Sequence, residues 1–339
     1  TRKAQPSQRI RLIRMKEKGI TGFALVFLLL SSCTDVVERN KSYGDGNDSY
    51  LLPIEDKKKF SEKQVKLLKD LGYELIRAGE FKMGSPFHEP GRPPVKNTND
   101  EDPLNDEDEE RLTTVRLSND YFIGKFEVSN AEWALIWKSN VEKLSSPTEP
   151  VTQVSHTRAM AYCRELTRLM QIMEILPENT ICRLPTEAEW EYACRAGNDG
   201  VHGFMMSEGD QSEFKNVFNA DDANFARSSG SSGQTKLYGS DLSSYSFKDF
   251  SKNKWDLYHM HGNVREWCYD LYGVQYENPF SREVSIDPIG RLEGKYRVLR
   301  GGSFRTYWTK CRSAARDFAE PYTMKDDIGF RVVIGHPIR

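Results

Sequence analysis

Apolar residues recur at helical spacing in four segments of the chain, which predict four helices. These are residues 61–71, a segment that follows Ser129, residues 155–176, and a segment from Thr186 to a stop at Gly197. Two of them begin with a capping box, Ser129-Asn-Ala-Glu132 and Thr186-Glu-Ala-Glu189, in which the hydroxyl and the carboxylate satisfy free amides at the helix start. We expect Ala131, Trp133, Ala134 and Trp137 to form the apolar face of the second helix.

Alternating apolar and polar positions predict strands at residues 73–84 and 115–126, and later strands at residues 297–300 and 328–334. Residues 198–255 are rich in loop-forming residues, and no glycine-rich nucleotide loop occurs. Strands and helices do not alternate regularly, so the pattern favours an α+β fold over a doubly wound one. We expect one loop-rich globular domain over residues 73–336.

The first 33 residues have the pattern of a bacterial export signal. Seven Lys/Arg and one Glu within residues 1–18 precede an apolar run at residues 20–30, which is too short for a stable transmembrane helix. Leu30-Ser31-Ser32-Cys33 resembles a lipobox, in which Cys33 is lipidated. An ordinary signal peptide with a chance cysteine, or a buried helix, is the alternative. Met15 is the expected start, with residues 1–14 as upstream extension.

The lipobox interpretation predicts a lipid-anchored protein of the bacterial cell envelope. More than one acyl chain on Cys33 gives stable anchoring, and Thr34 after the cysteine favours the outer membrane. Residues 34–72 are expected to form a polar tether and the short helix.

Net charge argues against nucleic-acid binding. Without the first 33 residues, 41 basic and 49 acidic side chains remain, a net charge of −8, which repels phosphate backbones. Eight of the acids lie in residues 99–110. They lack the order of an EF-hand calcium loop and are expected to be solvated.

Four motifs, in this order, resemble the formylglycine-generating enzyme (sulfatase-modifying factor) family. They start at Tyr121 (YFIGKFEVSN), Arg183 (RLPTEAEWEYACRAG), Gly262 (GNVREWC) and Arg297 (RVLRGGSF), and are followed by CRSAAR from Cys311 and IGFRV from Ile328. The resemblance covers about Glu74 to Ile334 and implies a C-type-lectin-like α+β fold. We expect a charge network around the capped helix from Arg183, Glu187, Glu189, Glu191 and Arg195, with Trp190 and Ala193 packed inward.

The resemblance also implies a copper site, which this chain does not complete. Catalytic relatives hold copper between two cysteines, three and eight residues beyond the serine of Arg-Gly-Gly-Ser. Those positions are Thr306 and Cys311 here, and one thiol cannot replace the pair that suits monovalent copper. Aligning CRSAAR instead makes Cys311 a core cysteine, and then both positions are lost. Copper is therefore not expected, and no catalytic residue is assigned beyond the single candidate Cys311.

Other family features match in part. A disulfide between Cys163 and Cys311 is one expectation, with two buried thiols as the alternative. One calcium site is matched at Gly262, Val264 and Glu266, although His259 replaces an oxygen ligand there, and Asn224 and Phe225 match part of a second site that lacks its downstream Asp. The sequence His259-Met260-His261 could also be interpreted as a copper site. The simpler interpretation is that the two histidines serve packing and contact with solvent.

The late loops offer the best candidate ligand surface, with Arg305, Tyr307, Trp308, Lys310, Phe318 and Tyr322. Aromatic and arginine side chains suit partner recognition. We therefore expect a non-catalytic, membrane-tethered protein that binds an envelope protein or a glycan, or serves envelope assembly. The alternatives are a copper-dependent oxidase acting on a sulfatase cysteine, a related metal-dependent oxidase, or a bare structural spacer.

Overall fold

The computed structural model describes residues 60–93, 110–137, 139, 144–176, 179–203, 223–225, 227–229, 236–238, 250–273 and 284–338. The predicted signal segment, Cys33, the tether to residue 59 and residues 99–109 of the acidic run lie outside them. Within the described residues, no helix has the length and apolar character needed to cross a membrane.

The helices are short apart from one. Those of the described residues include α4 (Glu62–Asp70), α5 (Asn130–Ile136), α6 (His156–Ile172), α7 (Glu187–Arg195) and the 3₁₀ turn η4 (Trp308–Lys310). The predicted capping boxes at Ser129 and Thr186 are confirmed, and Ser61 forms a further one with Gln64. The expected helix at 155–176 stops four residues early, with Met173 as its C-cap.

The strands form small, mixed sheets. The first sheet has the order β1 (Tyr73–Ile76), β4 (Tyr121–Gly124), β13 (Val333–Gly335) and β5 (Ile181–Arg183). The second has β11 (Arg316–Ala319), β10 (Arg297–Arg300), β8 (Arg265–Leu271) and β12 (Ile328–Gly329), and the third has β2 (Gly79–Met83), β3 (Thr113–Leu117) and β9 (Ser285–Ile286). β6 (Arg227–Ser229) pairs with β7 (Lys236–Tyr238).

Two predicted strands proved to be bent ribbons that serve two sheets. Residues 73–84 divide into β1 and β2, and the second run divides into β3 and β4. Asp120 holds the corner, because its carboxylate accepts from the amide of Ala78 (2.8 Å) and the guanidinium of Arg77 (2.7 Å). The prediction of continuous strands was wrong here, since alternation does not reveal where a strand changes sheet. Residues 328–334 divide in the same way, into β12 and the start of β13.

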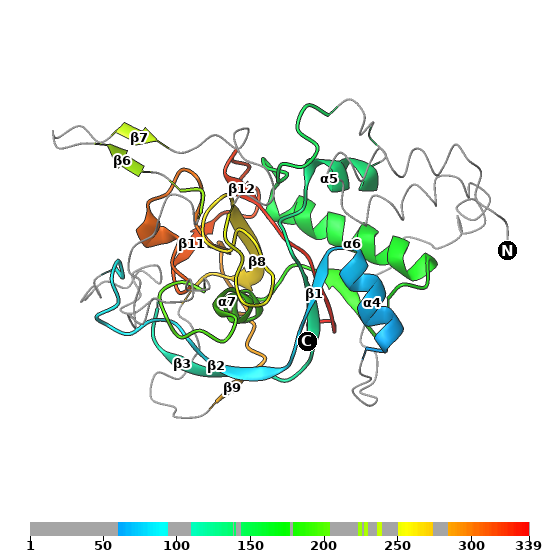
Figure 1. Cartoon of the computed structure of the whole chain (residues 1–339), viewed down its shortest axis with the longest axis horizontal. Coiled ribbons are helices and arrows are strands. Elements are labelled where there is room, and N and C mark those ends of the chain that lie inside the picture. The colour runs from blue at the N-terminus through cyan, green and yellow to red at the C-terminus, as the bar shows by residue number, and fades with distance from the viewer. Residues whose placement is uncertain are drawn as a thin grey trace.

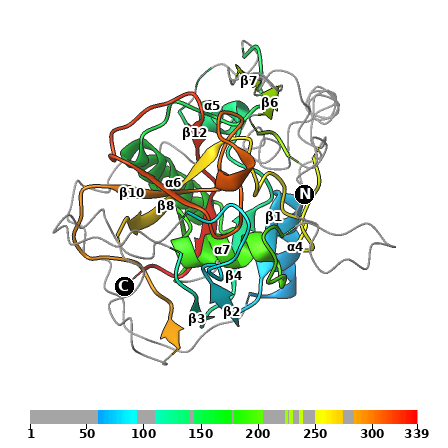
Figure 2. The same cartoon turned by 90° about the vertical axis from the view of Figure 1, so that its left-hand side faces the viewer.

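The first sheet is buried on both faces. Phe122 and Ile334 contribute to one apolar cluster with α6, whereas Ile123 and Val333 contribute to a second cluster around α7. Successive side chains of a strand point to opposite faces, so β4 and β13 separate the two clusters. Figure 1 shows α4 and α6 together on one side of the molecule and β11 on the other, and Figure 2 looks onto the β11 side.

The expected charge network around α7 is confirmed and is larger than predicted. Trp190 and Ala193 are fully buried, and Glu191 pairs with both Arg195 and Arg300. The remaining pairs are Arg183–Glu189 and Arg316–Glu187. By contrast, Trp137 lies at the exposed edge of the predicted apolar face: its side chain is 41% exposed at the end of α5, and its ring contacts that of Trp133.

Candidate functional site

The turn after β10 brings the Arg-Gly-Gly-Ser motif against Cys311. Gly301 and Gly302 adopt φ angles of +90° and +70°, which glycine tolerates best. A Cβ atom on Gly302 would lie 2.6 Å from the Cys311 sulfur. The second glycine is therefore required both for the backbone angle and for the close approach of the cysteine.

Thr306 closes this turn with its hydroxyl group. Its Oγ1 accepts from the amide of Ser303 (2.8 Å) and donates to the carbonyl of the same residue (3.1 Å). The Cys311 sulfur lies 3.8 Å from Thr306 Oγ1 and 3.6 Å from the Tyr307 carbonyl oxygen. The two positions counted from the motif are thus neighbours in space, as the resemblance implies.

The chemistry at this pair does not fit monovalent copper. Cys311 is fully buried, and burial raises the pKa of its thiol to about 12. The Thr306 hydroxyl opposite is a hard, weakly acidic group and cannot replace the second sulfur that monovalent copper needs. The other cysteines of the described chain belong to the two clusters beside the first sheet, whereas Cys311 packs with Ala223, Phe225 and Trp308.

The predicted disulfide between Cys163 and Cys311 is wrong in this structure. Both residues are free thiols. Cys163 faces inward from α6 into the cluster with Phe122, and Cys311 belongs to a separate small cluster beyond β10. The alternative of two buried thiols holds, and each behaves as a small apolar side chain.

His261 and His259 do not converge on a shared site. His261 accepts from the Gly203 amide at Nε2 (2.9 Å), so its Nδ1 donates to the Cys311 carbonyl (2.7 Å). Burial lowers the pKa of His261 to about 4, so the ring is neutral. The His259 ring instead contacts Glu127, with Nδ1 and Oε2 2.9 Å apart. Across the described residues, no three His, Cys, Asp or Glu side chains gather to hold a metal ion.

The matched calcium positions are occupied by protein contacts. Both carboxylate oxygens of Glu266 accept from Arg331 (2.6 Å each), and one also accepts from the Trp190 indole (2.7 Å). The Asn224 carbonyl accepts from Asn263, next to Gly262. Val264 is fully buried. The Glu266 carboxylate is thus engaged by Arg331 and Trp190, and a calcium site here stays a prediction.

Four of the six predicted ligand residues lie on the surface. Arg305, Tyr307, Lys310 and Tyr322 are exposed, and Tyr322 is 76% exposed. Arg305 forms a bidentate pair with Asp326, and this pair joins the loop after β10 to the loop after β11.

The other two predicted ligand residues serve packing. Trp308 packs beside Cys311, and a Cβ atom on Gly91 would meet its ring at 2.9 Å. Phe318 lies in an aromatic group with Tyr272 and Tyr296, at ring distances of 4.4 and 5.0 Å. The six residues therefore do not form one surface.

Sequence reasoning missed several residues that hold this region. Arg312 is fully buried and pairs with Glu89 and with Glu110, the last acid of the run expected to be solvated. Asp327 accepts from Ser303 and pairs with Arg265. None of these pairs is local in sequence, so periodicity gives no signal for them.

The comparisons with known proteins agree with the fold described above. The family model described as "Sulfatase-modifying factor enzyme 1-like domain" matches residues 60–336. The formylglycine-generating enzyme of Streptomyces coelicolor is 30% identical over 60% of this chain and 58% of its own length. The chaperone protein LppX of Paenibacillus barcinonensis is 25% identical over 56% of this chain and 71% of its own length.

Among solved structures, PvdO from Pseudomonas aeruginosa has 24% identity and a TM-score of 0.55, covering 77% of this chain and 93% of its own. At that identity the likeness supports the fold alone, the expected C-type-lectin-like α+β arrangement. The match to the first curated enzyme spans little more than half of that protein, so it does not carry the enzyme's activity across. The family model, however, covers most of the chain, and the chain belongs to the sulfatase-modifying factor enzyme 1-like domain family.

Proposed function

We propose that this chain is a non-catalytic member of its family that binds a partner in the bacterial cell envelope. The observation that carries this proposal is the pair of Thr306 and Cys311 in the segment that follows β10. The buried Cys311 thiol faces the Thr306 hydroxyl, where copper chemistry needs two thiolates. The chaperone name of one relative is compatible with a family role other than oxidation.

The proposed binding surface consists of Arg305, Tyr307, Lys310 and Tyr322. Its loops are held in place, because the side chains of Ser303 and Arg265 both donate hydrogen bonds to the carboxylate of Asp327. A hydrogen bond from the Gln153 backbone amide to the Lys325 carbonyl (2.9 Å) fixes the second loop as well. Exposed tyrosine and arginine side chains on a fixed backbone lose little entropy when a protein or glycan partner binds.

In Figure 1, β11, which leads into the loop that contains Tyr322, lies on the opposite side of the molecule from α4, the first described helix. A tether from a lipidated Cys33 to α4 would thus enter the domain on the side away from β11. Outer-membrane anchoring through Cys33 belongs to this proposal, and loss of acyl-chain labelling in Cys33→Ser would test it.

Copper(I) titration tests whether the domain binds the metal that catalysis in this family needs. We expect no stoichiometric tight binding by the wild-type domain in competition with a copper(I) chelator. Thr306→Cys is the matched variant, since it places a second sulfur where the hydroxyl now lies, 3.8 Å from Cys311, and it should gain copper affinity. Tight binding of one copper ion by the wild type, abolished by Cys311→Ala, would favour the oxidase instead.

Quantitative capture from solubilised envelopes tests the surface. Tyr307→Ala and Tyr322→Ala should each reduce recovery of the same envelope component several-fold, because each removes an exposed aromatic contact. Leu292→Ala is the control, because Leu292 is 82% exposed and lies outside the proposed surface. Equal recovery by all three variants, at unchanged melting temperature, would leave the spacer role as the better account.

A further inference from the structure

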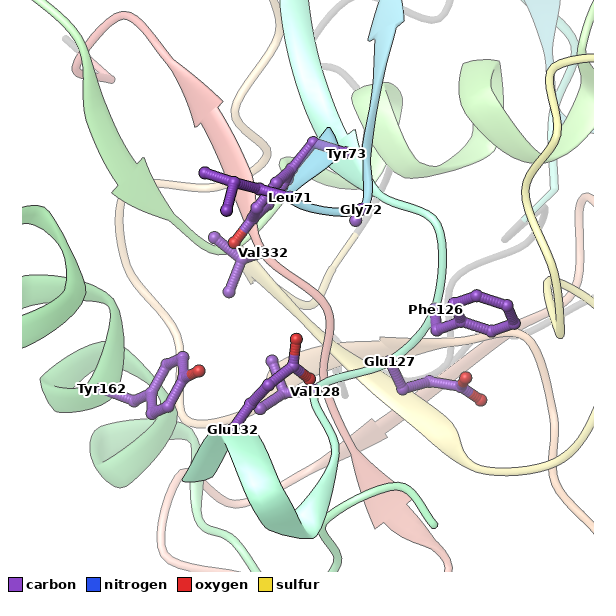
Figure 3. A pocket seen from close by; sticks show the side chains of 10 residues that line it. Leu71, Gly72, Tyr73, Phe126, Glu127, Val128, Glu132, Tyr162 and Val332 are labelled. Atoms are coloured by element: carbon purple, nitrogen blue, oxygen red, sulfur yellow. The ribbon is translucent and has the colours of Figure 1, made fainter. Parts of the chain in front are cut away.

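A small cavity between β1, α5 and α6 has room for solvent and not for a larger ligand. Its volume is about 30 Å³, and it is partly open to solvent. Figure 3 shows the hydroxyls of Tyr73 and Tyr162 and the carboxylate of Glu132 directed toward one another across it. Solvent water can reach these polar groups and bind them. A larger partner must therefore bind at the outer surface of the domain.

The loop of residues 85–92 holds a phenylalanine ring in solvent at a fixed position. Phe87 is 75% exposed, and the guanidinium carbon of Arg92 lies 4.6 Å from the centre of its ring. Arg92 donates from its side chain to the Ser85 carbonyl (2.6 Å) and from its amide to the Glu89 carbonyl (3.1 Å). The arginine thus closes the loop and covers one face of the ring, so the other face is open to a contact.

Buried contacts hold this loop against η4. The guanidinium of Arg312 binds the Glu89 carboxylate (2.7 Å) and donates to the Thr309 carbonyl (2.9 Å). Gly91 approaches η4 so closely that a Cβ atom would meet the Trp308 ring and the methyl group of Thr309, each at 2.9 Å. The loop and the part of the proposed binding surface around η4 therefore share one support.

The exposed charges on these two segments are positive. Residues 85–92 and 305–312 contain a single acid, Glu89, which is buried against Arg312. Lys310 is exposed, and in the part of the chain that the structure describes it forms no ion pair. The chain beyond residue 33 has 41 basic and 49 acidic side chains. A positive surface on an acidic domain favours an acidic partner.

The exposed ring and the lack of exposed carboxylates favour a protein partner over a glycan. Phe87 has no polar atom in its side chain, so it gains from binding only when an apolar group covers it. Glycan hydroxyls need acceptors, and the only carboxylate of these two segments is already bound to Arg312.

We propose that the loop at Phe87 and the neighbouring surface at Tyr307 and Lys310 bind a protein segment that presents carboxylate and apolar side chains together. This inference rests on the proposed function and names the class of its partner. Phe87 supplies the apolar contact, and Arg92 and Lys310 supply the positive charge.

Site-specific photo-crosslinking in the full chain, in whole cells of the native organism, tests the partner's class. The photoreactive residue p-benzoylphenylalanine at position 87 keeps an aromatic ring there. The control is the same residue at position 292, because Leu292 is 82% exposed and lies outside both segments. We expect one discrete, protease-sensitive adduct at position 87 and none at position 292. Adding Lys310→Glu should reduce the yield roughly fivefold or more, whereas Lys310→Arg should preserve it.

The other outcomes contradict the proposal in different ways. A protease-resistant adduct would show a glycan or a lipid and would overturn the class of partner. A crosslink within the chain itself, or equal yields at positions 87 and 292, would overturn the site. A fall in the melting temperature of Phe87→Ala would assign the exposed ring to folding instead of binding.

The photoreactive residue in place of Tyr307 separates this inference from the proposed function. An adduct at position 307 without one at position 87 would remove Phe87 from the binding surface and leave the proposed function standing. The absence of adducts at both positions would contradict the proposed function as well.

Discussion

Two arginines, five residues apart at the end of β10, form the same kind of bond in opposite surroundings. Arg300 pairs with Glu191, and both side chains are completely buried. Arg305 pairs with Asp326, and the two side chains are 56% and 51% exposed. The first pair lies between β10 and α7, whereas the second joins two surface loops.

The comparison separates the supporting part of the molecule from the part that can meet a partner. Arg300 also donates to the Ala315 carbonyl and lies 5.2 Å from the Trp190 ring centre, so its position is fixed on several sides. Arg305 lies over the Phe304 ring and in solvent. A buried pair is costly to break, while an exposed pair contributes little and is easily exchanged for a partner's groups.

Breaking the buried pair should have the largest effect. Arg300→Met leaves Glu191 with one arginine instead of two and should destabilise the fold by about 3–5 kcal/mol, because the buried carboxylate loses one of the two charges that compensate it. Urea unfolding measures the change. Adding Glu191→Leu to Arg300→Met should recover part of the loss, and a strictly additive double variant would contradict the pairing.

Asp270 is a buried acid without an arginine partner among the described residues, and the pH dependence of stability can distinguish it from the paired Glu191. Within the described chain no lysine or arginine lies at ion-pair distance from Asp270, which accepts from the Glu187 amide. Burial, and then the nearby Glu187, raise the pKa of Asp270 from 3.8 to about 8. The folded state therefore binds this proton more tightly than the unfolded state, and its contribution to stability falls as pH rises from about 4 to about 8.

Asp270→Asn should remove this pH dependence while keeping an oxygen for the Glu187 amide. Between pH 5 and pH 7 the wild type should lose about 2–3 kcal/mol relative to the variant. Urea unfolding at the two pH values gives the difference directly. Parallel pH profiles of wild type and variant would show that Asp270 is ionised in the folded protein.

Breaking the exposed pair should have the smallest effect. Arg305→Ala should change stability by less than about 1 kcal/mol, because solvent and salt already screen the bond to Asp326. Its effect should appear in partner capture instead. A loss of stability as large as that of Arg300→Met would place Arg305 in the framework and remove it from the binding surface.

The sequence predicts local structure well where one short segment contains the whole signal. The capping boxes at Ser129 and Thr186 and the strand at 297–300 are of this kind, and each is confirmed. The family motifs also placed Arg183 and Glu189 in one network. These features depend on residues a few positions apart, where spacing and geometry correspond directly.

Features that depend on distant partners were not predictable. Nothing near Glu110 indicates that it is buried against Arg312, some 200 residues later. An aromatic side chain such as Phe318 could equally bind a ligand or pack inside the protein. Only its contact with the Tyr272 ring shows that it packs. The corner at Asp120 was missed for the same reason, because strand alternation continues on both sides of it.

The position of β13 has a consequence for how the chain acquires its shape. This strand is the last described one, yet it lies in the interior of the first sheet, between β4 and β5. Residues just before it supply Arg331, the partner of Glu266. A polypeptide that has emerged only as far as residue 327 therefore lacks the middle of its sheet and cannot close either apolar cluster. Assembly of this sheet must therefore wait for residues 333–335, although β1 and β4 are complete by residue 124.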